Sequence, residues 1–318
     1  MLKKLFAILS IVFVAALISA NAAFGQKKKQ PDDKVRTVTI PISIFTKKEQ
    51  KESRQDEFVE AGDLTVKEDG DDQTILSIRS VSSTPLAIAV LIQDDLTSTA
   101  NLQLGDIKKF IRNLPSGTRV MVGYLRSGSI QIRQKFTEDL EKAANSIRII
   151  AGSSTVAPSS PYQQLDDALD RFDALPSGRR AVLLVSDGLD TSRGIDSASP
   201  AQSLDLDRAI LKAQRKSVAV YSFYNPATST AGENSRLVSF GQGSLEKLSD
   251  ETGGRAFFQG TIAPISFEPF FKDLNQALNR QFALTYLSTH FKKGYHKLKV
   301  ESTNSDVKIE HPKGYYYR

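Results

Sequence analysis

The chain has 318 residues, a formal net charge of +6 from 42 basic and 36 acidic side chains, and no cysteine. Its apolar and charged fractions are those of an ordinary globular protein. The missing cysteines exclude disulfides, thiol catalysis, cysteine-ligated zinc and a lipid anchor on cysteine. Basic and acidic residues interleave after the first few dozen positions, so we expect no nucleic-acid partner.

Residues 1–25 have the pattern of a secretion signal peptide. Lys3 and Lys4 precede an apolar run from Leu5 to Ile18, and the small residues around Ala22 fit a cleavage site. The apolar run is shorter than the ~20 residues that a membrane-spanning helix needs. We therefore predict a secreted or periplasmic protein with no stable membrane span after cleavage. The alternative is an uncleaved membrane anchor.

Residues 26–83 form the predicted N-terminal β segment. Val35–Phe45 alternates apolar and polar residues, and Leu64–Val66 and Thr74–Ile78 are short strands of the same kind. The connection between the last two contains Asp69-Gly70, which is a hairpin signal. The segment therefore predicts three strands of an antiparallel sheet.

From residue 84 to residue 280, apolar runs alternate with helical stripes. Four runs predict strands covered on both faces: Leu86–Ile92, Arg119–Leu125, Arg180–Val185 and Val218–Phe223. Leu104–Leu114 and Phe267–Leu278 are two of the helical stripes between and after them, and Asn225–Gly241 is one of the long polar loops. This alternation predicts an α/β fold, a doubly wound and mostly parallel sheet with helices on both faces.

Residues 281–318 form the predicted C-terminal β segment. Phe282–Leu287, Leu298–Glu301 and Val307–Glu310 have strand patterns separated by turns. Each terminal β segment alone has too few strands to bury a face. We therefore predict that the two segments pack together as one small antiparallel β domain.

Oxygen-bearing side chains follow two of the buried strands. Asp94 and Asp95 end the first run, together with the hydroxyls of Thr97 and Thr99, and Asp187 follows the run Arg180–Val185. The carboxyl ends of parallel strands are where open α/β sheets bind ligands, and hard oxygen ligands suit Mg²⁺ or Ca²⁺. The alternative is a solvated turn that caps the next helix. The three histidines near the end of the chain have no metal-ligand spacing.

Three sequence pieces carry a resemblance to a known family. They are Asp63–Gly70, the strand and loop Ala181–Gly188, and the closing Lys313–Tyr316. In this order they resemble the von Willebrand factor type A (vWA) domain, and most of all the secreted bacterial proteins in which that domain lies between a leading and a trailing β segment.

The resemblance implies a metal-ion-dependent adhesion site in degenerate form. Its metal residues would be Asp95, Thr97, Thr99 and Asp187. The family's first loop has serines where Thr97 and Thr99 stand, and Gln93 or Asp94 could occupy the position of its first aspartate. The threonine of the second loop is missing, and Ser159, Ser160 or Tyr162 occupies that region. We therefore expect no bound cofactor, with Mg²⁺ as the one candidate ion.

The leading functional hypothesis is a secreted, adhesion-type module that is not an enzyme. It would bind an unidentified protein partner of the cell envelope through loops at the carboxyl edge of the sheet, since long loops on a rigid scaffold commonly carry binding. One alternative is a hydrolase or phosphoryl-transfer enzyme that uses Asp94 and Asp95, although no glycine-rich phosphate loop accompanies them. The other is a structural envelope protein without a specific ligand.

Overall fold

The computed structural model describes residues 35–46, 63–81, 84–126, 128–150, 159–176, 178–227 and 235–317. Thr37–Arg318 form one compact unit. The predicted signal peptide, residues 1–25, lies outside the described residues. Among the described residues, no helix has both the length and the apolar composition needed to cross a membrane.

A six-stranded sheet forms the centre of the α/β part. Its strand order is β6-β5-β4-β7-β8-β9, and all neighbours are parallel except β6, which is antiparallel to β5. The strands are β4 (Leu86–Gln93), β5 (Arg119–Arg126), β6 (Ser129–Thr137), β7 (Arg179–Ser186), β8 (Ala219–Tyr224) and β9 (Ala256–Phe257). Every residue of β4 is buried, as a central strand covered on both faces requires. The predicted fold class is confirmed.

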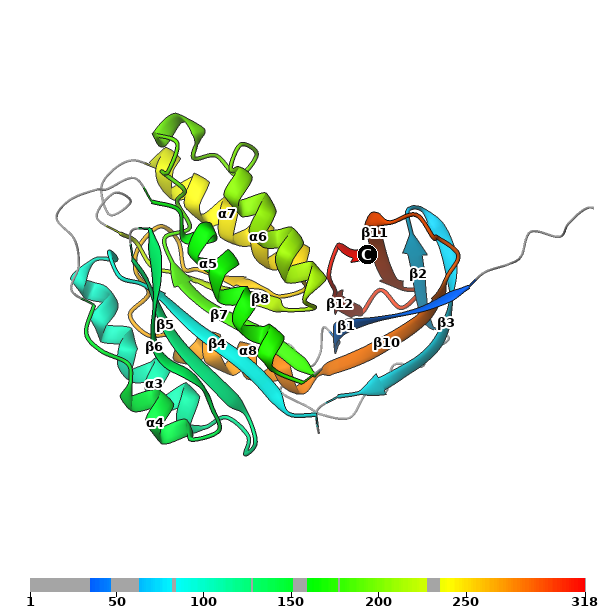
Figure 1. Cartoon of the computed structure of the whole chain (residues 1–318), viewed down its shortest axis with the longest axis horizontal. Coiled ribbons are helices and arrows are strands. Elements are labelled where there is room, and N and C mark those ends of the chain that lie inside the picture. The colour runs from blue at the N-terminus through cyan, green and yellow to red at the C-terminus, as the bar shows by residue number, and fades with distance from the viewer. Residues whose placement is uncertain are drawn as a thin grey trace, which may run out of the picture. The chain divides into compact units, whose positions relative to one another are not determined.

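Helices cover both faces of this sheet (Figure 1). One layer contains α3 (Leu104–Arg112), α4 (Leu140–Asn145) and α8 (Glu268–Asn279), and the other contains α5 (Pro161–Leu169), α6 (Leu204–Arg215) and α7 (Ser235–Thr252). The part of the chain that the structure describes also contains three short 3-10 helices, η2 (Ser98–Gln103), η3 (Asp170–Ala174) and η4 (Ile195–Ser197). Two separate apolar cores result, one on each side of the sheet.

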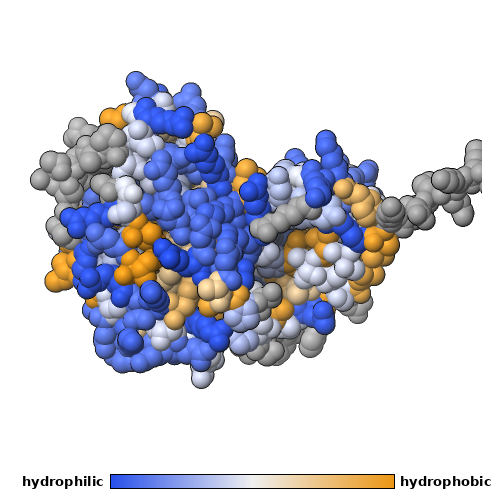
Figure 2. All heavy atoms as spheres, in the orientation of Figure 1, coloured by the Kyte–Doolittle hydropathy of each residue, from blue (hydrophilic) through white to orange (hydrophobic). Residues whose placement is uncertain are grey.

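Aromatic packing fixes α8 against the first face. Phe223 of β8 lies 4.9 Å from the ring of Phe257 and 5.0 Å from the rings of Phe267 and Phe271. The outer surface over α5, α6 and α7 is largely hydrophilic (Figure 2). There Lys212 pairs with Asp166 at 2.7 Å, so the polar stripes of the helices face solvent as their periodicity predicts.

The terminal β segments form one seven-stranded sheet. Its order is β12-β1-β10-β3-β2-β11-β13, and every pair with a described register is antiparallel. The strands are β1 (Arg36–Thr46), β2 (Leu64–Glu68), β3 (Asp71–Ser80), β10 (Gln281–Ser288), β11 (Gly294–Ser302), β12 (Val307–Glu310) and β13 (Gly314–Tyr317). The C-terminal β10 lies between β1 and β3 of the N-terminal segment. The predicted split β domain is therefore confirmed.

One prediction about an individual element differs from the structure. α7 begins at Ser235, so the predicted loop Asn225–Gly241 is wrong over its last seven positions. Gly241 and Gly243 lower helix propensity there, but Leu237 and Val238 continue the buried stripe of the helix. α4 is capped by Asp139, whose side chain accepts a hydrogen bond from the backbone N–H of Lys142. The closing Gly-Tyr stretch forms the strand β13.

Candidate functional site

The candidate site lies where β4 and β7 end. Ile92 stands opposite Val185 in the parallel register, so the residues after each strand emerge at the same edge of the sheet. The loops that follow bring the acidic and hydroxyl side chains of the two segments to this edge, as the parallel topology predicts.

Gln93 is the side chain that connects the two strand ends. It is buried, and its Oε1 accepts hydrogen bonds from Ser186 Oγ at 2.5 Å and from the backbone N–H of Asp187 at 3.1 Å. The sequence left open whether Gln93 or Asp94 takes this position. Of the two, it is Gln93 that bonds to the Asp187 loop, so a neutral amide faces that loop.

Asp94 forms a charge pair on the other side of the sheet edge. Its two carboxylate oxygens each accept a hydrogen bond from the guanidinium of Arg148 at 2.8 Å, and its side chain is only 5% exposed. The Arg148 guanidinium lies 4.2 Å from the ring centre of Tyr124, and the hydrogen bond to Asp94 raises the pKa of Arg148 above its ordinary value. Such a bidentate pair is geometrically specific, so Asp94 holds Arg148 in place.

Asp95 lies apart from that pair. It is partly buried and lines a cavity of about 10 Å³ together with Gln93, Ser159, Pro161 and Gln164. This volume accommodates about one water-sized sphere. The cavity adjoins α5, whereas Arg148 follows α4 in the opposite helical layer. The two adjacent carboxylates therefore face opposite helical layers: Asp94 pairs with Arg148, and Asp95 faces the cavity beside α5.

Thr97 and Thr99 lie at the start of η2. Their hydroxyl oxygens are 2.6 Å apart and share a hydrogen bond. The backbone N–H of Thr97 donates to the carbonyl of Pro226 at 3.0 Å, which ties this turn to the segment after β8. Both side chains are accessible to solvent.

The Asp187 loop is packed tightly against two helices. Asp187 is buried, and its Oδ1 accepts from the backbone N–H of Leu189 at 3.1 Å. Gly188 has φ +70°, and a Cβ on Gly241 of α7 would lie 2.0 Å from the carbonyl oxygen of Asp187. The hydroxyl of Tyr162 donates to the carbonyl of Gly188 at 2.6 Å. Only glycine at position 241 permits this backbone approach.

The three candidates for the missing threonine have separate roles. Ser159 exchanges hydrogen bonds with Thr191: its carbonyl accepts from the Thr191 N–H at 2.9 Å, and its own N–H donates to Thr191 Oγ1 at 3.1 Å. Ser160 is the buried N-cap residue of α5. Burial raises the pKa of Tyr162 well above its ordinary value, so this phenol stays a hydrogen-bond donor. Ser159 and Tyr162 thus stabilise the loops around the edge, whereas the buried hydroxyl of Ser160 makes no cap hydrogen bond to α5.

The predicted metal residues Asp95, Thr97, Thr99 and Asp187 all lie at this edge. Asp187 accepts a hydrogen bond from the backbone N–H of Leu189 in its own loop. The hydroxyls of Thr97 and Thr99 are hydrogen-bonded to each other, and Asp95 faces the small cavity. Two carboxylates and two hydroxyls are hard ligands that could hold Mg²⁺, and metal binding by them stays a prediction.

The sequence did not reveal a group of exposed apolar side chains beside this edge. Leu102, Ile149, Ile262 and Ile265 are 71%, 73%, 69% and 90% exposed, and we call them the apolar edge patch. Their segments are joined by hydrogen bonds: Asn101 Oδ1 accepts from the Ile150 N–H at 2.7 Å, and Gln103 Nε2 donates to the Pro264 carbonyl at 2.5 Å. The patch could not be predicted, because the spacing of apolar residues in these loop segments does not distinguish an exposed isoleucine from a buried one.

Comparisons with known proteins give likeness in fold. No family model and no curated protein matches the sequence. A von Willebrand factor type A protein from Catenulispora acidiphila is 11% identical, with a TM-score of 0.46 over 77% of this chain and 74% of that chain. BatB from Bacteroides thetaiotaomicron is 12% identical, with a TM-score of 0.41 over 61% and 97%. An aerotolerance-related membrane protein from Bacteroides fragilis is 12% identical, with a TM-score of 0.40 over 61% and 98%.

The chain contains an α/β domain with a mostly parallel sheet. This domain comprises β4 to α8, and its flanking β segments pair in the separate antiparallel sheet. At these identities the likeness concerns the fold, and a fold does not determine a function.

Proposed function

We propose that this chain is an exported interaction module that binds another protein at the carboxyl edge of its parallel sheet. The apolar edge patch carries the proposal. Its four side chains are 69% to 90% exposed although each is a large aliphatic group. Exposed apolar groups gathered on one face commonly mark an interaction surface.

The segments that present the patch are held firmly. The guanidinium of Arg148 donates to the carbonyl of Ile149 at 2.9 Å while it clamps Asp94. The backbone at Ile149 is therefore held by the Asp94–Arg148 pair, so less ordering entropy is lost there when a partner binds. The hydroxyls of Thr97 and Thr99 provide a polar rim. A partner segment with aliphatic side chains at its centre and hydrogen-bonding groups around them fits this surface.

Binding on this surface would not require a metal ion. Gln93 supports this part of the proposal, because its amide oxygen accepts from Ser186 and Asp187 where the resemblance implies a metal-site loop. The pair Asp94 and Asp95 is likewise proposed to be non-catalytic. The clamp of Arg148 on Asp94 supports this, because both oxygens of that carboxylate are already engaged in hydrogen bonds.

Site-specific cross-linking in the producing cells tests the proposal. A photo-reactive amino acid is placed at Ile265 in one version of the full chain and at Leu76 of β3 in another. Leu76 is also a large exposed aliphatic residue, at 48%, but lies in the other sheet. We expect a discrete cross-linked protein from Ile265 and none from Leu76. Equal products from both positions, or none from either, would contradict the proposal.

Export is tested separately. The resemblance to secreted vWA proteins and the signal pattern of residues 1–25 predict a mature N-terminus near Ala23 or Gln26. Mass spectrometry of the protein outside the cytoplasm measures this directly, and an intact Met1 on that protein would refute it.

A further inference from the structure

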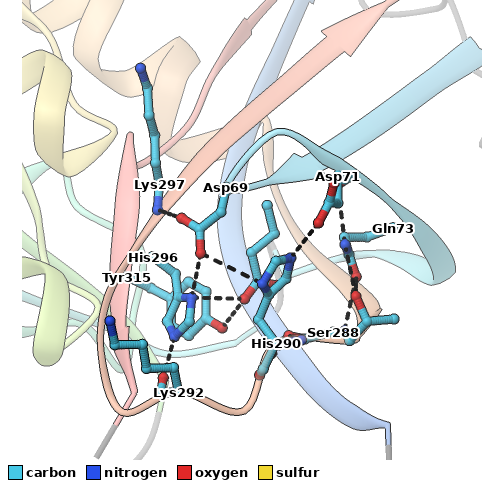
Figure 3. Close-up of polar contacts among 11 residues, drawn as sticks. Asp69, Asp71, Gln73, Ser288, His290, Lys292, His296, Lys297 and Tyr315 are labelled. Atoms are coloured by element: carbon cyan, nitrogen blue, oxygen red, sulfur yellow. Dashed lines mark hydrogen bonds and ion pairs between the residues drawn. The ribbon is translucent and has the colours of Figure 1, made fainter. Parts of the chain in front are cut away.

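Two histidines and an aspartate meet at the rim of the antiparallel sheet (Figure 3). Asp69 lies at the turn of the β2–β3 hairpin with φ 52°. His290 belongs to the connection between β10 and β11, and His296 lies in β11. The ligand atoms of these three residues are all within 4.8 Å of one another, and among the described residues they are the one such group of three metal-ligating side chains.

The distances place three or four donor atoms around one point. His296 Nδ1 lies 2.8 Å from Asp69 Oδ2 and 3.3 Å from Glu68 Oε1. His290 Nδ1 lies 3.7 Å from the same Asp69 oxygen. The side chains of His296 and Glu68 are 4% and 0% exposed, and His290 is 23% exposed. Asp69 is 36% exposed, so the site is closed on the side of His296 and Glu68 and open on the side of Asp69 and His290.

The hydrogen bonds of His296 decide how its ring is oriented. Nε2 lies 2.6 Å from the carbonyl oxygen of Lys292. A carbonyl only accepts, so Nε2 carries the hydrogen. Nδ1 lies 2.8 Å from the Asp69 carboxylate, which also only accepts, so Nδ1 donates a hydrogen to it when no ion is bound. A metal ion that replaced this hydrogen would lie between the Nδ1 lone pair and the carboxylates of Glu68 and Asp69.

His290, Asp69 and Glu68 also contact polar groups that would lie outside the ligand shell of an ion. His290 Nε2 lies 3.3 Å from Asp71 Oδ2, and the second oxygen of Asp69 accepts from the backbone N–H of Lys297 at 2.8 Å. Tyr315 donates its hydroxyl hydrogen to Glu68 Oε1 at 2.7 Å. Metal-ligating histidines almost always donate their other ring N–H to a carboxylate or a backbone carbonyl, and such partners fix the ligand orientation.

We propose that Asp69, His290 and His296 bind a divalent transition-metal ion, with Glu68 as the fourth ligand. Two imidazoles and carboxylate oxygens suit Zn²⁺, which is commonly four-coordinate with bonds of about 2.0–2.2 Å to such atoms. Small side-chain shifts around the ion suffice, because all donors already surround one point. The ion would connect the β2–β3 hairpin to the β10–β11 connection, and hence the two terminal β segments of the split sheet.

Titration of the full mature chain with Zn²⁺ after treatment with a chelator tests this site. Isothermal calorimetry in a buffer that does not bind metal gives the stoichiometry and affinity, and the visible absorption of Co²⁺ reports nitrogen and oxygen ligation. We expect one saturable site. His290→Gln and Asp69→Asn should weaken binding at least tenfold. Asparagine tolerates the left-handed backbone of position 69, so Asp69→Asn should keep the hairpin intact.

Asp72→Asn provides the matched control. Asp72 lies in the same hairpin with a side chain that is 78% exposed, and its substitution should leave Zn²⁺ affinity unchanged. Circular dichroism of each chelator-treated variant establishes that it is folded. Absence of saturable binding by the folded wild-type chain would overturn the proposal and leave His296 as a doubly protonated partner of the carboxylates. Undiminished binding by both His290→Gln and Asp69→Asn would overturn it as well.

Discussion

Replacing Arg148 by methionine should destabilise the protein through Asp94. Methionine keeps most of the length and apolar surface of the side chain but removes the guanidinium. Asp94 then loses both hydrogen bonds of 2.8 Å while its side chain stays only 5% exposed. Among the described residues, only Arg126, whose Nε lies 4.0 Å from Asp94 Oδ2, then remains as an ion-pair partner, so the carboxylate is weakly paired and poorly hydrated.

The expected loss is about 2–4 kcal/mol of unfolding free energy. Breaking a fully buried ion pair by removal of one partner costs about 3–5 kcal/mol. Arg148 is 29% exposed, so water enters the vacated space and reduces this penalty. Loss of the contact with the Tyr124 ring, 4.2 Å away, adds about 0.5–1 kcal/mol.

Urea unfolding of the wild type, Arg148→Met, Asp94→Asn and the double variant measures this coupling. We expect the double variant to be more stable than the sum of the single losses predicts, by at least about 1.5 kcal/mol. Arg119→Met is the control, because Arg119 pairs with Glu138 at 2.9 Å on the surface and should lose less than about 1 kcal/mol. Additive losses, or a loss from Arg148→Met no larger than that of the control, would refute the buried clamp.

Three further predictions follow from other parts of the fold. Gly241→Ala should cost at least about 1–3 kcal/mol in urea unfolding, because the new Cβ would lie 2.0 Å from the Asp187 carbonyl; unchanged stability would contradict the close approach. Burial lowers the pKa of His311 from 6.5 to about 4. The unfolded chain therefore binds the proton first, and stability should fall by up to about 3 kcal/mol as the pH decreases from 6.5 to 4. His311→Gln should remove this slope, and an identical slope in the variant would disprove the assignment. Deleting residues 281–318 removes four of the seven strands of the antiparallel sheet, so hydrogen exchange of β1–β3 should accelerate far more than that of β4–β8; unchanged protection of β1–β3 would show that the segment folds alone.

Most of the fold could be predicted because a strand that is buried on both faces has an uninterrupted apolar sequence. The run Leu86–Ile92 has no polar interruption, and β4 is buried at every position. Asp69-Gly70 predicts a hairpin, and both residues indeed have positive φ, 52° and 100°. The start of α7 was missed because the glycines that permit its contact with the Asp187 loop also mimic a loop in sequence.

The details of the site depend on contacts that are distant in sequence. Asp94 and Arg148 are 54 positions apart, and no local pattern joins them. That Gln93 and not Asp94 bonds to the Asp187 loop depends on the register of β4 with β7, since a shift of one residue exchanges the two faces of a strand. The histidine spacing suggested no metal ligands, because the third ligand candidate, Asp69, lies 227 positions before His296 and reaches it only through the split sheet.

The central claim is that the apolar edge patch binds a protein partner. The most direct measurement is the affinity of the cross-linked partner, once purified, for the wild-type chain and for Ile265→Asp, with Leu76→Asp as the control. Both replaced residues are exposed, at 90% and 48%, so neither variant should lose more than about 0.5 kcal/mol of stability. We predict saturable binding that weakens at least tenfold in Ile265→Asp and is unchanged in Leu76→Asp. Equal affinity of all three proteins for the partner would contradict the account.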